Sequence, residues 1–361
     1  MSTTKKFVAA AVGLGLVTLS ACTSSDSGDG EGASESKTVT LVSHDSWAAS
    51  KSVIRDFEKQ SGYQVKVLKD GDAGQALNKA ILTKDNPQGD VLFGVDNTLL
   101  SRAFDNDLFQ AYEAKDSDLL PPEYRIDQQK KRITPIDFGD ICVNYDKAYF
   151  EENDLTPPES FDDLVKPEYK DLLVTENAST SSPGLGFLLG TAAKYGNDGW
   201  RDYWTKLKAN GVKVVDGWEQ AYNEEFSGSA GGKKAKGDRP LVVSYASSPP
   251  AEVVFADPKP DTAPTGVAYG TCFRQIEYAG LLSNAKNAKG GQALIDFLIS
   301  KKFQADMPLN MFVYPMREDA QIPEEFTKYG APAEDYEVMA PEDIAKNRDQ
   351  WVKSWTSLVL K

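Results

Sequence analysis

The sequence predicts an α/β protein of two lobes, each a mostly parallel sheet flanked by helices, with two crossover strands as the hinge. Three observations predict it. The chain has 361 residues, which suits two or three domains. Strand-like runs alternate with helical patterns along it, as in sheets covered by helices on both faces. The hydrophobic fraction is 40%, with 16 Phe and 15 Tyr, which supplies a core and excludes disorder for most of the chain.

The first third of the chain shows this alternation. Val53, Ile54 and Phe57 recur at helical spacing, and Ser61-Gly62 follows as a stop. Tyr63, Val65 and Val67 alternate as in a strand. The elements predicted here are strands at 39–42, 63–68 and 90–95 and helices at 51–60 and 73–83.

The same alternation continues to the C-terminus. The expected strands are 132–136, 141–145, 172–175, 212–215, 241–245 and 266–278. The expected helices are 179–193, 199–210, 218–226, 292–299 and a last one from about 341. We expect the chain to cross between lobes near 136–140 and again near 266–274. Lobe 1 would then comprise 38–137 plus about 270–361, and lobe 2 would comprise 138–269, with C-terminal helices able to pack across both.

The N-terminus has the pattern of a bacterial lipoprotein signal. Lys5 and Lys6 precede an apolar run over 7–19, which is short for a membrane span. The run ends in small residues before Cys22, the residue that takes a diacylglycerol in that chemistry. We expect 1–21 to be the signal peptide and 22–37 a disordered tether, because the tether has no large apolar residue. The expected location is therefore extracytoplasmic and lipid-anchored; an ordinary secretory peptide with a chance Cys is the alternative.

Composition and missing motifs exclude several function classes. The formal net charge is −14, so the basic face of a nucleic-acid binder is not expected. One His and three Cys argue against a His-rich or paired-CxxC metal site. GxSxG and HExxH are absent. The P-loop-like GSAGGK at 228–233 is one residue short, and Lys234 stands where a magnesium-binding hydroxyl is needed. We expect no enzyme activity, cofactor or metal.

Polar and aromatic clusters directly follow predicted strands. They are Ser43–Trp47, Asp96-Asn97, Ser179–Gly184 and Tyr245–Pro249. Ligands in open α/β sheets bind beyond the carboxyl ends of strands, so we expect these clusters to face one cleft; ordinary polar loops are the alternative. Ser181 and Ser182 open a helix, where hydroxyls and free N–H groups suit an anion or simply cap the helix.

Two pairs of residues have an open interpretation. Trp218 and Tyr222 lie four residues apart, on one face of a helix if that helix forms; such a pair packs in a core or stacks on a ligand. Cys142 and Cys272 fall on the two expected crossing strands. In an exported protein we expect them to form a disulfide; two buried thiols are the alternative.

Motifs in order along the mature chain resemble the thiamine-binding lipoproteins of bacterial ABC importers, which have the type II periplasmic-binding-protein fold. The stretches that carry the resemblance are DSWAA at 45–49, DVLFGVDNTLL at 90–100, TPIDFG at 134–139, TSSPGLG at 180–186, GWEQAY at 217–222, SYASSP at 244–249 and YP at 314–315.

The resemblance implies a two-lobed trap that binds thiamine and presents it to a permease with its ATPase. It implies that Asp96 contacts the aminopyrimidine, that Trp218 and Tyr245 contact the rings, and that Ser181 and Ser182 face the hydroxyethyl or phosphate end. The same cleft would include Asp45, Trp47, Tyr222 and Phe312. The chain would be a monomer with no nucleic-acid partner, touching the membrane by its anchor alone.

Two positions depart from the pattern of the resembled proteins. Ala251 and Phe312 stand where some relatives have Tyr and Trp, so the aromatic cage is thinner. Thiamine and its mono- and pyrophosphate therefore all stay open as ligands. The alternatives are a carrier of this fold for phosphonate, polyamine, iron or another heteroaromatic cation, and an extracytoplasmic enzyme acting on a thiamine-like substrate.

Overall fold

The computed structural model describes residues 36–229 and 237–361. Ser36–Lys361 forms one compact unit. The predicted signal peptide 1–21, the lipidation site Cys22 and nearly all of the predicted tether lie outside the described residues.

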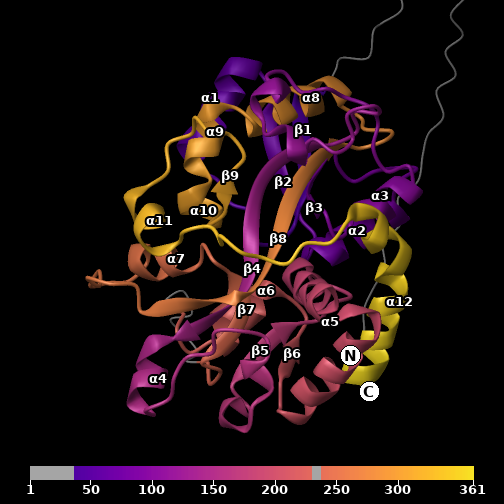
Figure 1. Ribbon diagram of the computed structural model, residues 1–361. Helices are drawn as coiled ribbons and strands as arrows, with labels where there is room; N and C mark the ends of the chain where they lie inside the picture. The colour runs from indigo at the N-terminus through magenta and orange to yellow at the C-terminus, as the bar shows by residue number, and fades with distance from the viewer. Residues whose placement is uncertain (1–35, 230–236) are drawn as a thin grey trace, which may run out of the picture. The chain divides into compact units, whose positions relative to one another are not determined.

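A nine-stranded sheet forms the centre of the described part of the chain (Figure 1). The strand order is β2-β1-β3-β8-β4-β7-β5-β6, and β9 pairs with β4. The strands are β1 (Thr38–Ser43), β2 (Gln64–Lys69), β3 (Val91–Asp96), β4 (Thr134–Asp146), β5 (Leu173–Glu176), β6 (Lys213–Val215), β7 (Leu241–Tyr245), β8 (Thr265–Leu281) and β9 (Tyr314–Pro315).

The two halves of the sheet are built alike. In one half β1 pairs in parallel with β2 and β3, and in the other β5 pairs in parallel with β6 and β7. β8 and β4 lie between these halves, antiparallel to each other and to β3 and β7. Each half thus has the predicted mostly parallel sheet. The residue boundaries of the two lobes stay a prediction.

β4 and β8 are the long strands that run from one half to the other (Figure 1). The sequence predicted two short strands at 132–136 and 141–145, but the structure joins them into one strand of 13 residues. The polar segment between them stays extended because it pairs with β8 throughout, with register shifts near Pro135 and Cys142.

Helices cover the sheet, and their positions follow the predicted apolar stripes. Val53 and Phe57 are the buried positions of the first helix, as their spacing predicts. The helices are α1 (Lys51–Ser61), α2 (Ala73–Leu82), α3 (Leu100–Asp105), α4 (Lys147–Glu152), α5 (Ser182–Ala209), α6 (Trp218–Gln220), α7 (Pro249–Val254), α8 (Ala288–Leu298), α9 (Lys301–Asp306), α10 (Pro308–Met311), α11 (Glu324–Tyr329) and α12 (Pro341–Val359). Short helical turns add η1 (Ser117–Leu119), η2 (Pro122–Tyr124), η3 (Asp163–Val165), η4 (Pro167–Tyr169) and the π-helical η5 (Ala221–Glu225).

α5 consists of the two predicted helices, separated by a kink. The sequence predicted helices at 179–193 and 199–210, and the structure has both, because the backbone of α5 is non-helical at Gly196, with φ of 72° and ψ of −179°, and a kink divides the helix there. Glycine adopts this left-handed conformation without steric cost. The second part of α5 packs on α12 through the edge-to-face contact of Trp204 with Trp355, with ring centroids 5.4 Å apart. The last helix therefore returns the C-terminus to the half that holds α5.

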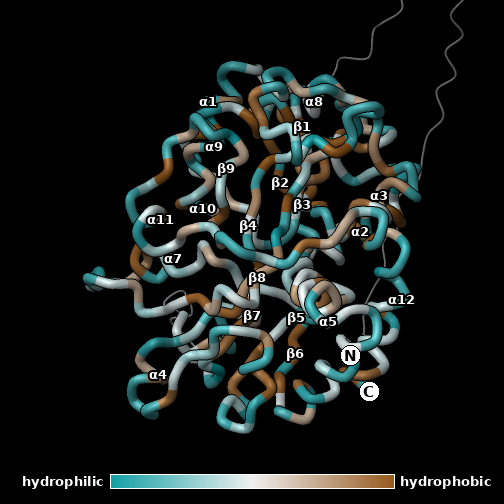
Figure 2. The backbone as a smooth tube through the Cα atoms, viewed as in Figure 1, coloured by the Kyte–Doolittle hydropathy of each residue, from teal (hydrophilic) through white to brown (hydrophobic). Residues whose placement is uncertain are grey.

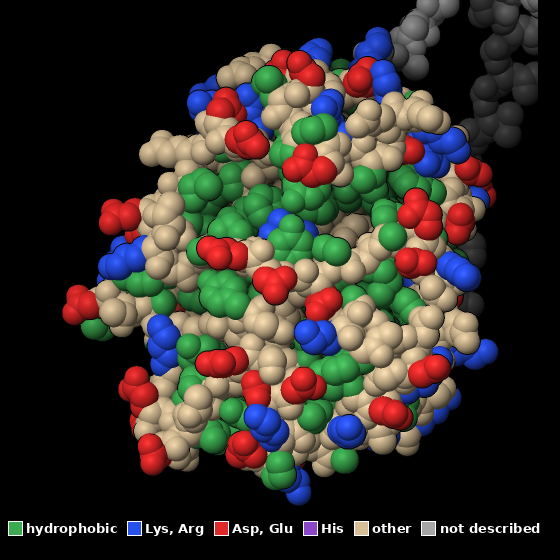
Figure 3. Space-filling model, in the orientation of Figure 1, with side chains coloured by type: hydrophobic (Ala, Val, Ile, Leu, Met, Phe, Trp, Pro, Cys, Tyr) green, Lys and Arg blue, Asp and Glu red, His purple; other side chains and the backbone are tan. Residues whose placement is uncertain are grey.

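Buried apolar residues lie mainly along the central strands and the helix faces that cover them. Figure 2 shows hydrophobic segments along these strands and hydrophilic segments at the outer turns. β3 is buried at every position, as an apolar strand covered on both faces should be. Figure 3 shows acidic and basic side chains interspersed on the face in view. None of the helices within 36–229 and 237–361 is long and apolar enough to cross a membrane.

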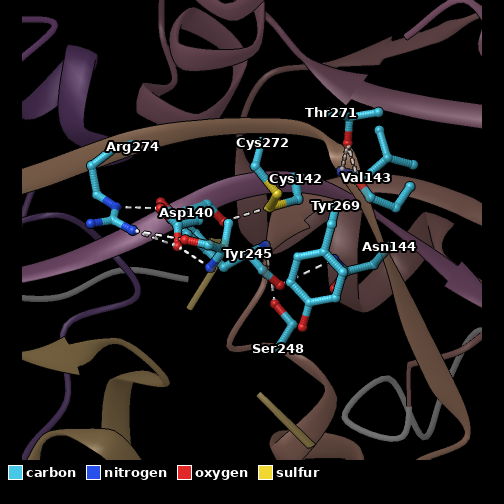
Figure 4. The surroundings of a disulfide bond; sticks show 12 residues. Asp140, Cys142, Val143, Asn144, Tyr245, Ser248, Tyr269, Thr271, Cys272 and Arg274 are labelled. Carbon is cyan, nitrogen blue, oxygen red and sulfur yellow. Dashed lines mark hydrogen bonds and ion pairs between the residues drawn. A yellow bond between two sulfur atoms is a disulfide. The ribbon is translucent and has the colours of Figure 1, made fainter. Parts of the chain in front are cut away.

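The predicted disulfide is confirmed: Cys142 on β4 is bonded to Cys272 on β8 (Figure 4). Both residues are buried. Nearby, Asp140 on β4 forms an ion pair with Arg274 on β8, and Asp140 also accepts from the backbone N–H of Ala333 at 2.8 Å. Covalent and ionic cross-links thus join the two long strands at neighbouring positions.

We expect the double variant Cys142→Ala/Cys272→Ala to lose about 2–5 kcal/mol of unfolding free energy, because the bond closes a loop of 130 residues and restricts the unfolded chain. Urea unfolding followed by circular dichroism measures the difference. A reducing agent should lower the stability of the wild type and leave the double variant unchanged. Equal stability of the oxidised wild type and the double variant would contradict this role.

Candidate functional site

One pocket collects strand ends and helix starts from both halves of the sheet. Its empty volume, including the open mouth, is about 540 Å³. The lining residues come from the loop after β1, the starts of α2, α5 and α6, the end of β7 and the turn after it, strand β8, and the end of α10 with the segment that follows. They are His44, Ser46, Asp72, Ala73, Ser182, Pro183, Trp218, Tyr245, Ser248, Glu277, Met311, Phe312 and Val313.

Aromatic side chains form one side of this pocket. Trp218 stacks on Tyr222 with ring centroids 5.0 Å apart and planes 16° from parallel. The indole Nε1 of Trp218 donates to Ser244 Oγ at 2.8 Å, which fixes the orientation of the ring. Tyr245 lies over Gly139, where an added Cβ would stand 2.8 Å from its ring. A larger residue at position 139 would displace Tyr245.

Phe312, which directly follows α10, also lines the pocket. Its backbone is left-handed, with φ of 55°, which is uncommon for a bulky residue. The ring is held by Phe255 at 5.3 Å and by Phe326 at 5.9 Å, and its carbonyl accepts from Ser247 Oγ at 2.6 Å. The surrounding contacts thus maintain a strained conformation that places the ring at the pocket.

Asp72 links the two sides of the pocket. It is the N-cap of α2, where its side chain accepts from the N–H of Ala73 at 2.6 Å. Its other oxygen accepts from the backbone N–H of Trp218 at 2.9 Å. One carboxylate therefore caps α2, holds the start of α6 and lines the cavity.

Asp96 is fully buried at the end of β3 and lies behind the pocket wall. Oδ1 accepts from the N–H and hydroxyl of Thr98 at 3.0 and 2.6 Å. Oδ2 accepts from Ser182 Oγ and from Gln275 Nε2, the latter at 2.8 Å. Burial raises the pKa of Asp96 to about 6, against the hydrogen bonds from Ser182 and Thr98, which lower it. Asp96 thus connects β3, β8 and the start of α5, and reaches the cavity through Ser182.

A second set of polar side chains, which includes His44 and Glu277, forms the floor of the pocket. His44 Nε2 lies 3.4 Å from Glu277 Oε1, and their side chains are 12% and 10% exposed. Asp137 on β4 is fully buried close to Glu277. Burial and the charge of Glu277 raise the pKa of Asp137 well above its usual range, and Glu277 itself lies beside His44.

The structure brings some of the sequence-predicted residues to the pocket and places others behind it. Ser182, Trp218, Tyr245 and Phe312 line the cavity. Ser181, Tyr222 and Asp96 are buried next to lining residues, and the hydroxyl of Ser181 has no hydrogen-bond partner.

In the loop after β1, the predicted residues Asp45 and Trp47 do not line the pocket, but residues next to them do. Asp45 Oδ1 accepts from the N–H of Gly71 at 3.1 Å, which ties the loop to the start of α2. Trp47 is 6% exposed and packs in the core. His44 and Ser46 line the cavity instead.

Sequence reasoning missed Asp72 and Glu277. The capping pattern of Asp72 three residues before Gln75 marks a helix start, and Glu277 is an ionisable residue in an otherwise apolar strand end. Both patterns were visible in the sequence.

Three comparisons with known proteins agree with the expected fold and resemblance. The sequence profile of a family described as bacterial extracellular solute-binding protein matches residues 86–246. The thiamine-binding periplasmic protein of Escherichia coli is 29% identical over 326 residues, covering 89% of this chain and 93% of that protein. The corresponding protein of Salmonella typhimurium is 28% identical with the same coverage.

Solved structures give the same result. A periplasmic thiamin binding protein superimposes with a TM-score of 0.76 at 27% identity and covers 91% of this chain and 98% of that one. A ferric binding protein from Campylobacter jejuni has a TM-score of 0.69 at 17% identity, a likeness of fold alone. The predicted two-lobed α/β fold and the predicted resemblance to thiamine-binding solute-binding proteins are thereby confirmed.

We expect the contribution of Asp96 to the unfolding free energy to fall as pH rises. Its folded-state pKa of about 6 exceeds the ordinary 3.8, so between about pH 4 and 6 the folded protein holds a proton that the unfolded chain has released. Asp96→Asn removes this titration. Relative to the variant, the wild type should lose roughly 3 kcal/mol of unfolding free energy across that range.

Urea unfolding at several pH values measures this difference, with Asp85→Asn, at an exposed site, as the control that changes the same charge. A difference between wild type and Asp96→Asn that stays constant with pH would contradict the assignment.

Proposed function

We propose that this chain is the extracytoplasmic solute-binding component of a bacterial ABC importer, which captures thiamine in the pocket between its two lobes and delivers it to the permease and its ATPase. The lobes would be 38–137 with about 270–361, and 138–269. The observation that carries the proposal is one cavity lined by Trp218, Tyr245 and Phe312 together with the carboxylates of Asp72 and Glu277.

The chemistry of these side chains suits thiamine. Its thiazolium ring is a cation and its aminopyrimidine is flat and carries an amine. Aromatic faces attract such a cation by about 0.5–2 kcal/mol for each desolvated contact, and carboxylates accept hydrogen bonds from the amine. We assign ring contacts to Trp218 and Tyr245, with Phe312 closing the cage.

The remaining predicted residues support this cage. Tyr222 backs Trp218, and Asp96 holds Ser182, so both act as positioning residues. In this proposal Ser182 meets the hydroxyethyl or phosphate end of the ligand, with Ser181 beside it. The loop of Asp45 and Trp47 fixes the position of His44 and Ser46.

The expected location is extracytoplasmic, and the expected role is binding without catalysis. The named relatives are periplasmic binding proteins, and the chain's N-terminal pattern agrees with export. We propose a diacylglycerol anchor at Cys22 after removal of 1–21, a monomeric state, and ligand release without chemical change.

Titration calorimetry of the purified protein, unfolded and refolded to remove carried-over ligand, tests the function. We expect submicromolar binding of thiamine, with the monophosphate and pyrophosphate measured in parallel. Trp218→Ala should weaken thiamine binding at least tenfold, because it removes the stacked ring, while Trp218→Phe should lose less.

Tyr269→Ala, which removes an exposed aromatic ring outside the pocket, should bind as the wild type does. Unchanged affinity in Trp218→Ala would remove that residue from the site. Absence of binding to all three compounds, in folded protein, would indicate a carrier of this fold for a different solute.

A further inference from the structure

His44 is the chain's single histidine, and it lines the pocket. Its ring packs on Phe93 with centroids 5.5 Å apart. It also lies against Gly94, where an added Cβ would stand 2.4 Å from His44 Cδ2. Packing on β3 therefore fixes the ring, with Nε2 directed at Glu277.

The charges around this ring favour a protonated histidine. Burial is the largest single influence and lowers the pKa of His44, but Glu277 and, to a smaller extent, Asp72 together outweigh it, so the net pKa lies above 6.5. The charged or titratable groups around the His44–Glu277 pair are Asp45 on the same loop, Lys69 on β2, Asp72 at α2, Asp96 on β3, Asp137 on β4 and Tyr245 on β7. Lys69 opposes the protonation, but its amine is hydrogen-bonded to the carbonyl of Asp45 at 2.6 Å.

We propose that the pocket exchanges a proton for its cationic ligand: His44 is protonated beside Glu277 in the free protein and releases that proton to solvent when thiamine enters. This inference rests on the proposed function. The bond that breaks is Nε2–H of the imidazolium, and the proton passes to water or buffer.

Electrostatics gives the reason for the exchange. A protonated His44 and a thiazolium would be like charges in one poorly hydrated cavity, and such charges repel strongly at low dielectric. When His44 is neutral, the carboxylates of Glu277 and Asp72 both face the cavity, and the ligand cation compensates one of these two charges. The ligand charge thus takes the place of the proton beside Glu277.

The exchange makes affinity depend on pH in a definite direction. Below the pKa of His44 each binding event releases up to one proton, so the association constant rises with pH; above it the dependence ends. Between about pH 6 and 8 we expect thiamine affinity to increase roughly five- to tenfold. Calorimetry in buffers of different ionisation enthalpy counts the protons released.

Nuclear magnetic resonance gives an independent measurement, since one histidine yields one pair of imidazole ring signals. The pKa read from these signals should be lower in the thiamine complex than in the free protein. This comparison uses the wild-type protein and does not depend on the folding of a variant.

The variant His44→Gln keeps a polar side chain beside Glu277 but cannot carry the charge. It should bind thiamine with nearly the same affinity at pH 6 and 8, whereas Asp85→Asn, at an exposed site beyond the far end of α2, should keep the wild-type dependence. An equal or higher histidine pKa in the complex, or an unchanged pH dependence in His44→Gln, would overturn the inference. Absence of thiamine binding at every pH would instead overturn the proposed function.

Discussion

The antiparallel pairing of β4 with β8 organises the centre of the sheet. These two strands carry the chain between the halves of the sheet, and their register sets which residues meet at its centre. Glu277 of β8 pairs with Asp137 of β4, and Gly139 leaves the space that Tyr245 fills. The disulfide and the Asp140–Arg274 ion pair join the same strands. The pocket floor is therefore built on the most strongly cross-linked part of the sheet.

Carboxyl groups gather around this floor, and burying them opposes folding. Asp96, Asp137 and Glu176 are fully buried, and burial raises the pKa of each. The carboxyl oxygens of Asp137 and Glu176 have no hydrogen-bond partner. An unpaired buried ion is costly, so burial favours the protonated form of each of these carboxyl groups.

Much of the fold could be predicted because hydrophobic periodicity is local. The strands at 39–42, 90–95 and 241–245 were found within one or two residues of β1, β3 and β7. The site was predicted less completely, because a side chain's place depends on distant partners. Trp47 was expected in the cleft, but it packs in the hydrophobic core. Asp72 lines the pocket, where its carboxylate accepts a hydrogen bond from the backbone N–H of Trp218 at the start of α6.

The stacked Trp218 also gives the protein an intrinsic optical reporter. The chain has six tryptophans, and the other five are at most 6% exposed, with rings packed away from the cavity. Trp218 is the partly exposed one, and it lies on the cavity wall. On the proposed function, ligand entry would change the polarity and the ring contacts of this indole, while the other five lie outside the lining of the cavity. A change in intrinsic fluorescence on ligand addition therefore comes mainly from one residue, and it lets occupancy be followed in real time without a label.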